Sequence, residues 1–252
     1  MGLIINELPE IDKVYTDHIQ ALNDPKLLKE YQDLCFDLHL PCPSAYWTLE
    51  TRIKDKLIER KRQPAGSWTR NFWNWMAMSQ LSINCNAVTP DFGAGYLTWK
   101  TTSGVIKGST TDIIEIGTGA NFTFETQGGY GYRAGVTANY GILVGTDATA
   151  FSIENYVLGA LIANGTGAGQ LSYQGMAIPS VTWTQGSLTM NVNWYRYMNN
   201  NTANTITVEE VGLAAYTEQG YILFERHVTG GLAVPATAQL KCDYDMSIVY
   251  SA

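Results

Sequence analysis

The histidines and one adjacent pair of glutamates are the residues of this chain best suited to acid–base chemistry. His18, His39 and His227 each stand alone, with no cysteine, serine or carboxylate at motif spacing. Glu209 and Glu210 are consecutive, so in a strand their side chains point to opposite faces and cannot act as an acid–base pair. The sequence therefore carries no ordinary catalytic constellation, and we predict a protein that is not an enzyme.

A glycine-rich segment, GTGAGQ at residues 165–170, has the outline of a phosphate-binding loop. It lacks the Lys-Ser/Thr pair that contacts phosphates and metal, and the next residues, LSY at 171–173, predict a strand instead of a helix. A phosphate site of this kind depends on the N–H groups of a helix amino terminus. We therefore predict no nucleotide and no other cofactor.

Four cysteines are spread along the chain, at positions 35, 42, 85 and 242. They form no CxxC motif and have no histidine at ligand spacing, which argues against a zinc site or any other metal site. We predict buried free thiols made in a reducing cytoplasm, although the spacing of Cys35 and Cys42 also allows a bridge.

Charge and apolar content limit the classes of partner. Only 15% of the 252 residues are charged, the net charge is −7, and 45% are apolar, enough for a sizeable core. Nucleic-acid binding needs a basic patch, and the short basic clusters near residues 52–56 and 60–62 are typical of a solvated face. No apolar run of 18 residues is present, so we expect no membrane-spanning helix.

The character of the chain changes near Ser67. Of the first 70 residues 21 are charged, whereas the remaining 182 hold only 18 charges and 22 of the 24 glycines. This contrast predicts a charged α/β arm at residues 1–65 that docks on a neighbour, followed by a β domain at residues 66–252.

The clearest helix signal lies within the arm, at about residues 25–39. Asn23-Asp24-Pro25 offers a helix cap followed by proline at the first helical position, and Pro41 ends the pattern. The apolar residues recur at helical spacing, and a helix this short needs a partner surface for its apolar stripe. The interface candidates on this stripe are Leu27, Leu28, Tyr31, Leu34 and Leu38.

A hairpin is predicted at residues 46–61. Apolar and polar residues alternate from Tyr46 to Ile53, and Asp55-Lys56 can form the turn before the chain returns. A helix is the alternative, because glutamate, lysine and arginine are also good helix formers.

A tryptophan-rich helix is predicted at residues 68–78, with Ser67 as its cap. Trp68 and Phe72 lie on one face, and Trp73 falls about 100° away, so the helix is apolar over much of its circumference. We predict that it plugs one end of the β domain; the alternative is that Trp73 or its neighbours contact another subunit. These three aromatic residues complete the set of interface candidates.

From about residue 93 the pattern becomes that of an all-β domain. Over residues 240–248 every second residue is apolar, which is the strongest strand signal of the chain. The NNN segment at 199–201 predicts a hairpin-like turn between two strands. A series of short strands of this kind is typical of a β-sandwich or jelly roll. The other predicted strands lie at 96–100, 112–116, 141–144, 181–184, 187–196, 205–211 and 221–228.

The aromatic residues of the β domain raise a rival function. Exposed aromatic rings on a β-sandwich can stack on sugars, so a receptor- or glycan-binding module is the alternative to a purely structural part. The simpler interpretation places Trp99, Trp183 and Trp194 in the core.

The residues from Ser67 onward resemble a set of virion proteins of tailed bacteriophages. The resemblance covers about three quarters of the chain and lies in the order of its motifs; residues 1–65 fit it least. The motifs are SWTRNFWNW at 67–75, GILVGTDATAFSIENYVLGALIANGTGAGQLSY at 141–173, ITVEEVGL at 206–213, FERHV at 224–228 and VPATAQLKCDYDMSIVY at 234–250.

The resemblance implies a structural component of the particle, in the tail, at a fibre attachment or on the head surface. It provides no catalytic residue to carry over, and it implies other virion proteins as partners. By analogy we expect a homo-oligomer, most simply a trimer, made in the bacterial cytoplasm and built into the virion. A glycan of the host surface is the ligand that the alternative function implies.

Overall fold

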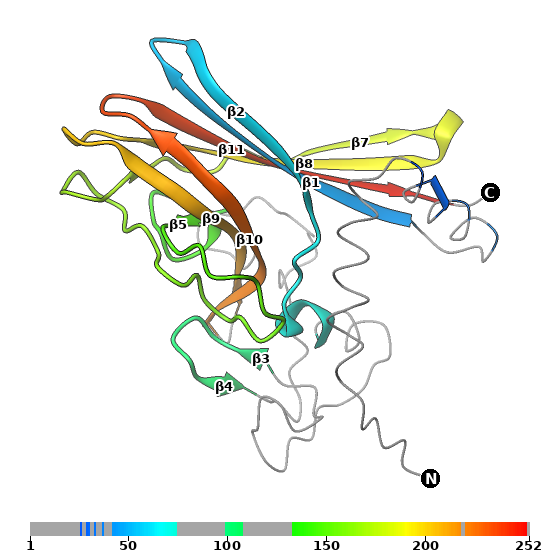
Figure 1. The fold of residues 1–252 in the computed structure, drawn as a ribbon. Helices are drawn as coiled ribbons and strands as arrows, with labels where there is room; N and C mark the ends of the chain where they lie inside the picture. The colour runs from blue at the N-terminus through cyan, green and yellow to red at the C-terminus, as the bar shows by residue number, and fades with distance from the viewer. Residues whose placement is uncertain are drawn as a thin grey trace.

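The computed structural model describes residues 42–74, 99–107, 133–217 and 220–250, together with five helical positions between residues 26 and 37. The described strands are paired antiparallel in three sheets of six, three and two strands (Figure 1). The predicted class, a mainly β protein with antiparallel sheets, is thereby confirmed.

The large sheet has the strand order β2-β1-β11-β8-β6, and β7 pairs with the same side of β8 as β6 but at the other end of that strand. A short 3-10 helix (Gln185–Ser187) joins β7 to β8. The bounds of the strands are β1 (Cys42–Ile53), β2 (Lys56–Ala65), β6 (Ser172–Tyr173), β7 (Ser180–Thr184), β8 (Thr189–Asn199) and β11 (Gln239–Val249).

The second sheet has the order β10-β9-β5, and a separate two-stranded sheet pairs β3 with β4. In Figure 1 the second sheet lies below the large sheet, at the end away from β7. The bounds are β5 (Gly141–Gly145), β9 (Ile206–Thr217), β10 (Gly220–Val234), β3 (Trp99–Lys100) and β4 (Ile106–Lys107).

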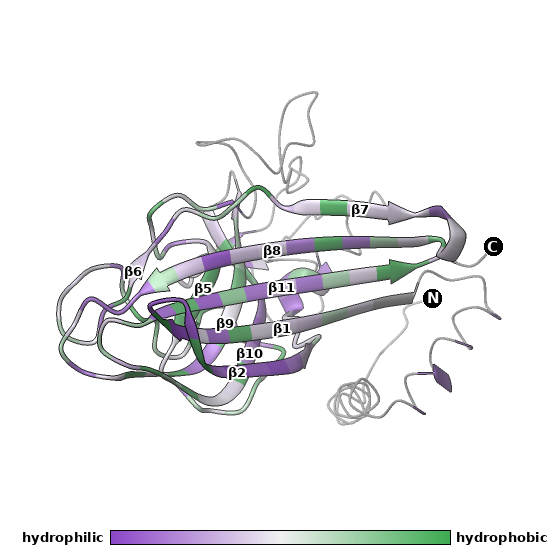
Figure 2. Ribbon diagram, turned by 90° about the horizontal axis from the view of Figure 1, so that it is seen from above, coloured by the Kyte–Doolittle hydropathy of each residue, from purple (hydrophilic) through white to green (hydrophobic). Residues whose placement is uncertain are grey.

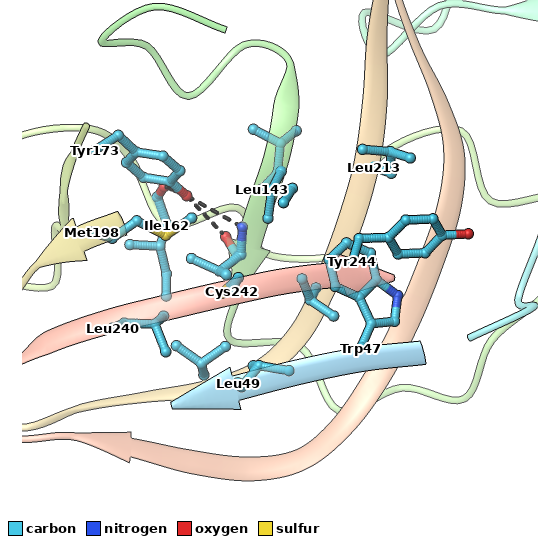
Figure 3. Close-up of a cluster of buried hydrophobic side chains, with 14 of the residues drawn as sticks. Trp47, Leu49, Leu143, Ile162, Tyr173, Met198, Leu213, Leu240, Cys242 and Tyr244 are labelled. Carbon is cyan, nitrogen blue, oxygen red and sulfur yellow. Dashed lines mark hydrogen bonds between the residues drawn. The ribbon is translucent and has the colours of Figure 1, made fainter. Parts of the chain in front are cut away.

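Side chains of the two larger sheets meet in one hydrophobic cluster (Figure 3). Trp47 and Leu49 enter it from β1 and Cys242 from β11, while Leu143 and Leu213 enter it from the second sheet. The inward residues of each strand are two apart, because successive side chains of a strand point to opposite faces. The alternation predicted for residues 240–248 thus has its physical cause in this core.

The predicted hairpin is present, because β1 and β2 pair antiparallel around Lys54 and Asp55. Both turn residues have positive φ, 48° and 65°, the conformation that tight two-residue hairpin turns require. Strand β1 also pairs with β11 along its length, and its Trp47 is fully buried. The hairpin predicted within the arm is therefore paired into the large sheet, and the domain boundary between residues 65 and 66 stays a prediction.

The prediction of a hairpin-like turn at residues 199–201 is wrong in one respect. The turn does not close a hairpin: it leads from β8 in the large sheet to β9 in the second sheet. Asn200 is buried, and its amide donates to the carbonyl oxygens of Val234, at 2.7 Å, and Asn204, at 2.8 Å. A buried amide with these partners anchors a crossover, which local turn propensity cannot distinguish from a hairpin.

The other predicted strands from residue 141 onward coincide with β5 and with β7 to β11, and the strand predicted at 112–116 lies outside the described residues. Residues 70–74 are helical and follow Thr69, whose carbonyl oxygen accepts from Trp73 N. The helix predicted at 68–78 with Ser67 as its cap therefore begins later than predicted, because Trp68 forms an antiparallel β-bridge with Glu225 and Thr69 is not helical. Residues 75–78 lie outside the described residues.

Candidate functional site

The predicted interface residues of the first helix, Leu27, Leu28, Tyr31, Leu34 and Leu38, lie outside the described residues. The described positions are the polar face of that helix, which is exposed and has ion pairs four residues apart. The docking role of the apolar stripe therefore stays a prediction. The exposed helical residues are Lys26, Lys29, Glu30, Asp33 and Asp37.

The predicted interface aromatics of the second helix form a ring cluster. The Trp68 ring lies 4.8 Å from Phe72 and 5.5 Å from Trp73 between centroids, and Trp68 Nε1 donates to the Tyr244 hydroxyl at 3.3 Å. Phe72 packs against Phe224 of β10. Trp68 and Phe72 thus hold the start of the helix on the β domain, whereas 45% of Trp73 is exposed and can meet a neighbour.

The three tryptophans assigned to the core separate into two groups. Trp99 and Trp194 are buried, as expected, but Trp183 on β7 is 53% exposed, so for Trp183 that interpretation is wrong. Val181 on the same face of β7 is 54% exposed, and Ile178 just before the strand is also exposed. Apolar side chains thus gather on the surface at the β7 end of the large sheet.

The outer face of the large sheet carries a polar hollow of about 310 Å³, and Figure 2 looks down on this face. The Arg62 guanidinium lies over the Tyr46 ring, 4.1 Å from its centroid, on the β1–β2 side. Asn193 donates to Asp245 at 2.6 Å in the floor. The remaining polar lining residues are Ser180, Thr182, Asn191 and Ser247.

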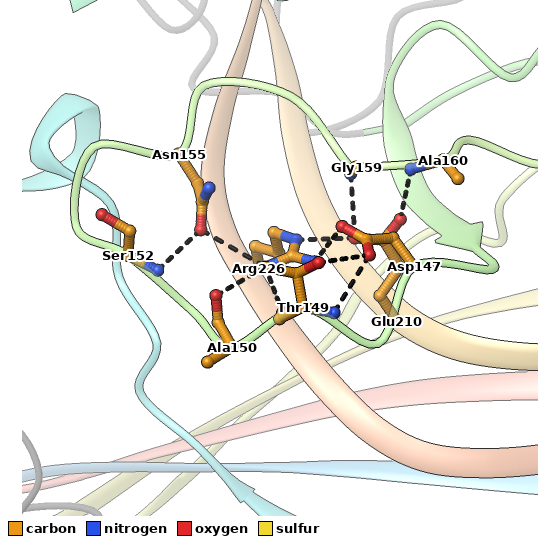
Figure 4. Close-up of polar contacts among 9 residues, drawn as sticks. All are labelled: Asp147, Thr149, Ala150, Ser152, Asn155, Gly159, Ala160, Glu210 and Arg226. Atoms are coloured by element: carbon orange, nitrogen blue, oxygen red, sulfur yellow. Dashed lines mark hydrogen bonds and ion pairs between the residues drawn. The ribbon is translucent and has the colours of Figure 1, made fainter.

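A buried ion-pair network lies between the second sheet and the loop at 146–160, and it centres on Arg226 of β10 (Figure 4). Arg226 is 1% exposed; its Nε donates to Glu210 Oε2 at 2.6 Å and its Nη2 to Asp147 Oδ2 at 3.0 Å. Glu210, fully buried on β9, also accepts from the backbone N–H groups of Gly159 and Ala160. These bonds fix the segment at 146–160 to the sheet.

The chemistry of this network is structural: it is a clamp of ion pairs and hydrogen bonds that holds the loop on the sheet. Asp147 and Glu210 meet at one arginine, but both oxygens of buried Glu210 already accept hydrogen bonds. Bonds from Thr149, through its hydroxyl and its backbone N–H, lower the pKa of the Asp147 carboxyl, and the charge of Arg226 adds to this effect. The network therefore favours the ionised form of Asp147 and leaves neither oxygen of Glu210 without a hydrogen-bond partner.

Sequence reasoning missed this network. As predicted, Glu209 and Glu210 lie on opposite faces, with Glu210 buried and Glu209 beside Gly231. The only local signal was a lone glutamate at an inward position of a predicted strand, and its partner Arg226 comes from the next strand. Asp147 comes from a loop about 60 residues before Glu210, so no spacing rule could have connected Asp147, Glu210 and Arg226.

A second buried arginine, Arg196 on β8, is held by backbone carbonyls. It is fully buried and its guanidinium lies 4.7 Å from the centroid of the Tyr173 ring. Burial lowers the pKa of Arg196 to about 10, so it remains a cation at neutral pH. The guanidinium fixes the segment at 133–143 against β8. The accepting carbonyls belong to Gly135, Thr137, Tyr140, Ile142 and Gln174.

Two more titratable groups of β10 are shielded from water, Glu225 fully and His227 in part. Glu225 accepts from Trp47 Nε1 and from the backbone N–H of Gly66, both at 3.0 Å, and burial raises the pKa of its carboxyl to about 7. Burial lowers the pKa of His227 to about 4, and its ring bonds Gln63 at 3.1 Å. His227 is therefore a neutral structural residue at pH 7.

The glycine-rich loop at 165–170 is closed on itself. Gln170 Oε1 accepts from Gly167 N at 2.9 Å, and Gly165 N donates to the Leu171 carbonyl at 3.1 Å. A Cβ at Gly165 would lie 2.2 Å from Gln170 Oε1, so the loop is tightly wound around that side chain. Strand β6 follows, in agreement with the predicted strand.

Comparison of the chain with known proteins gives no match: no family model, curated protein or solved structure is similar to it. Within the described ranges, no group of three histidine, cysteine, aspartate or glutamate side chains could hold a metal ion. In the same part of the chain, no helix has the length and apolar character needed to cross a membrane.

Proposed function

We propose that the protein is a non-enzymatic structural component of a tailed-phage particle, in the tail, at a fibre attachment or on the head surface. In this proposal the two larger sheets form a β-sandwich, and copies assemble through repeated contacts with one another and with other virion proteins. The motifs at 67–75, 141–173 and 206–250 support the assignment to the virion.

The observation that carries the proposal is the surface at the β7 end of the large sheet. Val181 and Trp183 are each more than half exposed, although both side chains belong to types that normally lie inside. Exposed apolar groups that gather on one strand are typical of a contact surface. The buried clamps at Arg196 and Arg226 favour a body that keeps its shape while this surface binds.

The test is the composition of the particle. Purified particles of the phage that encodes this chain should contain it in many copies, seen by mass spectrometry and located by electron microscopy with an antibody. A truncation of residues 1–40, which keeps β1, should reduce incorporation if the first helix docks. Particles that lack the protein would contradict the proposal. Unchanged incorporation of the truncated chain would contradict the docking role of the first helix.

Glycan recognition is the second candidate function, and the polar hollow on the large sheet favours it. Planar polar side chains such as Asn191, Asn193, Asp245 and Arg62 can bond neighbouring hydroxyl groups of a sugar in pairs. The hollow lies over three strand spacings between β1 and β7, which is about 14 Å and wide enough for a sugar ring.

A glycan array with the purified protein tests this alternative. Asn191→Ala should abolish any signal, because it removes an exposed amide from the hollow. Asn201→Ala, at an exposed amide outside the hollow, is the matched control and should leave the signal unchanged. The absence of binding to any host-surface glycan, or equal loss in both variants, would reject the hollow as a sugar site.

A further inference from the structure

The two edges of the large sheet differ in how they are protected. β2 forms one edge, and half of its ten residues are charged: Lys56, Glu59, Arg60, Lys61 and Arg62. Charges and proline on an edge strand, here Pro64, prevent other strands from pairing with it. β7, with the sequence SVTWT, lies on the opposite edge, has no charge, and is exposed at all five residues.

We propose that β7 pairs antiparallel with β7 of a second copy, around a two-fold axis at Thr182, so that two large sheets join into one. The inference rests on the proposed function and names the surface through which copies assemble. Among the described residues β7 pairs with β8 alone, and in the proposed pair the backbone groups on its other side bond those of the second copy.

The sequence of β7 is complementary to itself in this register. A two-fold axis at Thr182 places Val181 opposite Trp183 of the second copy, and Ser180 opposite Thr184. Pairs of an aromatic with a β-branched residue stabilise antiparallel strands, and the two Thr182 side chains meet on the other face. The same arrangement at β2 would bring Arg60, Lys61 and Arg62 toward like charges, so the second copy fits β7 and is rejected by β2.

The expected pairing is weak for a single contact. Val181 and Trp183 of two copies would bury on the order of 400 Å² of exposed apolar surface, since a whole aromatic side chain buries 150–250 Å². Stable interfaces bury roughly 1,200 Å² or more. We therefore expect a micromolar dimer that strengthens where other contacts in an assembly hold the copies together.

A cysteine scan of the full chain tests the register. Residues opposite one another in antiparallel strands have Cα atoms about 4.5–5.5 Å apart, within the range of a disulfide. Thr182→Cys should therefore give a disulfide-linked dimer under mild oxidation. Ser180→Cys, whose symmetry mate lies about 13 Å away along the strand, is the matched control and should link no more than the parent chain.

Sedimentation equilibrium of charge variants tests the contact without cross-linking. Val181→Lys should raise the dimer dissociation constant by roughly tenfold or more, because it places two charges in the joined edge. Ile58→Lys makes the same kind of change at a half-exposed residue of β2 and should leave the constant unchanged.

The outcomes separate the inference from the proposed function. The β7 pair is supported if Thr182→Cys forms the disulfide-linked dimer while Ser180→Cys does not, and if Val181→Lys weakens the dimer while Ile58→Lys does not. Oligomers that form without these effects overturn the β7 pair but leave the structural role in the particle. A wild-type chain that stays monomeric at high micromolar concentration, with no link at residue 182, also overturns the pair, and particle composition then decides the function separately.

Discussion

The two ends of the large sheet invert the usual distribution of polar and apolar side chains. At the end covered by the second sheet, Arg196, Arg226, Glu210 and Glu225 are fully or almost fully buried. At the β7 end, Trp183 and its apolar neighbours are exposed. Arg196, Arg226 and Glu210 each have three or more hydrogen-bond partners, so they fix loops and specify one conformation, whereas the exposed apolar groups are available for contact. Glu225 differs, because its Oε2 has no hydrogen-bond partner among the described residues.

The comparison assigns rigidity to one end and binding to the other. A buried charge is costly to desolvate and is tolerated only when it is paired and hydrogen-bonded, so its loss should destabilise the fold strongly. An exposed apolar residue contributes little to the folded monomer, so its loss should affect assembly and leave stability unchanged. Each of the following predictions tests one side of this contrast.

The largest effect is expected for Arg226→Met. The substitution leaves Glu210 buried without its cation, which should lower the free energy of unfolding by about 3–5 kcal/mol in urea titrations at pH 7. Adding Glu210→Gln should recover part of the loss, because the unpaired charge is then removed. A loss below about 1 kcal/mol in the single variant would show that the network does not hold the fold.

The next effect is a pH dependence due to Glu225. Because burial raises its folded pKa to about 7, above the ordinary value of 4.5, the folded state binds the extra proton and stability from this group is lost as pH rises from 4.5 to 7. Glu225→Gln should remove that loss, so its stability relative to wild type should increase by up to about 3 kcal/mol between pH 4.5 and pH 7.5. If the free energies of unfolding of wild type and Glu225→Gln changed with pH in parallel, the raised pKa of Glu225 would be contradicted.

His227 should act in the opposite direction. Its folded pKa of about 4 lies below the ordinary value of 6.5, so the unfolded state binds the proton and stability is lost as pH falls from 6.5 to 4. His227→Gln should flatten this part of the stability curve by about 2 kcal/mol, measured by urea titration at pH 4.5 and pH 7. If His227→Gln showed the same pH dependence of stability as wild type, the proton taken up on unfolding would belong to another group.

The smallest effect on stability is expected at the β7 end. Trp183→Ala should change the free energy of unfolding by no more than about 0.5 kcal/mol, since more than half of the ring is already in water. Trp99→Ala, the buried counterpart, should cost about 3–5 kcal/mol. Equal losses in the two variants would remove the distinction between a packed end and a contact end.

Local patterns predicted the elements of this fold well. The alternation at 240–248 became β11, and the alternation at 46–61 became the β1–β2 hairpin, because period two reflects one buried face. The same reasoning failed at residues 199–201, where a turn-forming sequence crosses between sheets. It failed again at Trp183, because a tryptophan that lines a core and one that lies on an open edge have the same local sequence pattern.

The sequence alone determined where strands form, which residues of each strand share a face, and that no motif of nucleotide or zinc chemistry is present. Only the tertiary structure decided which strands become neighbours, and hence that Asp147, Glu210 and Arg226 meet in the interior while β7 forms an edge. The physical reason is range: alternation is encoded by residues two apart, whereas a buried ion pair and a sheet edge depend on contacts between segments tens of residues apart.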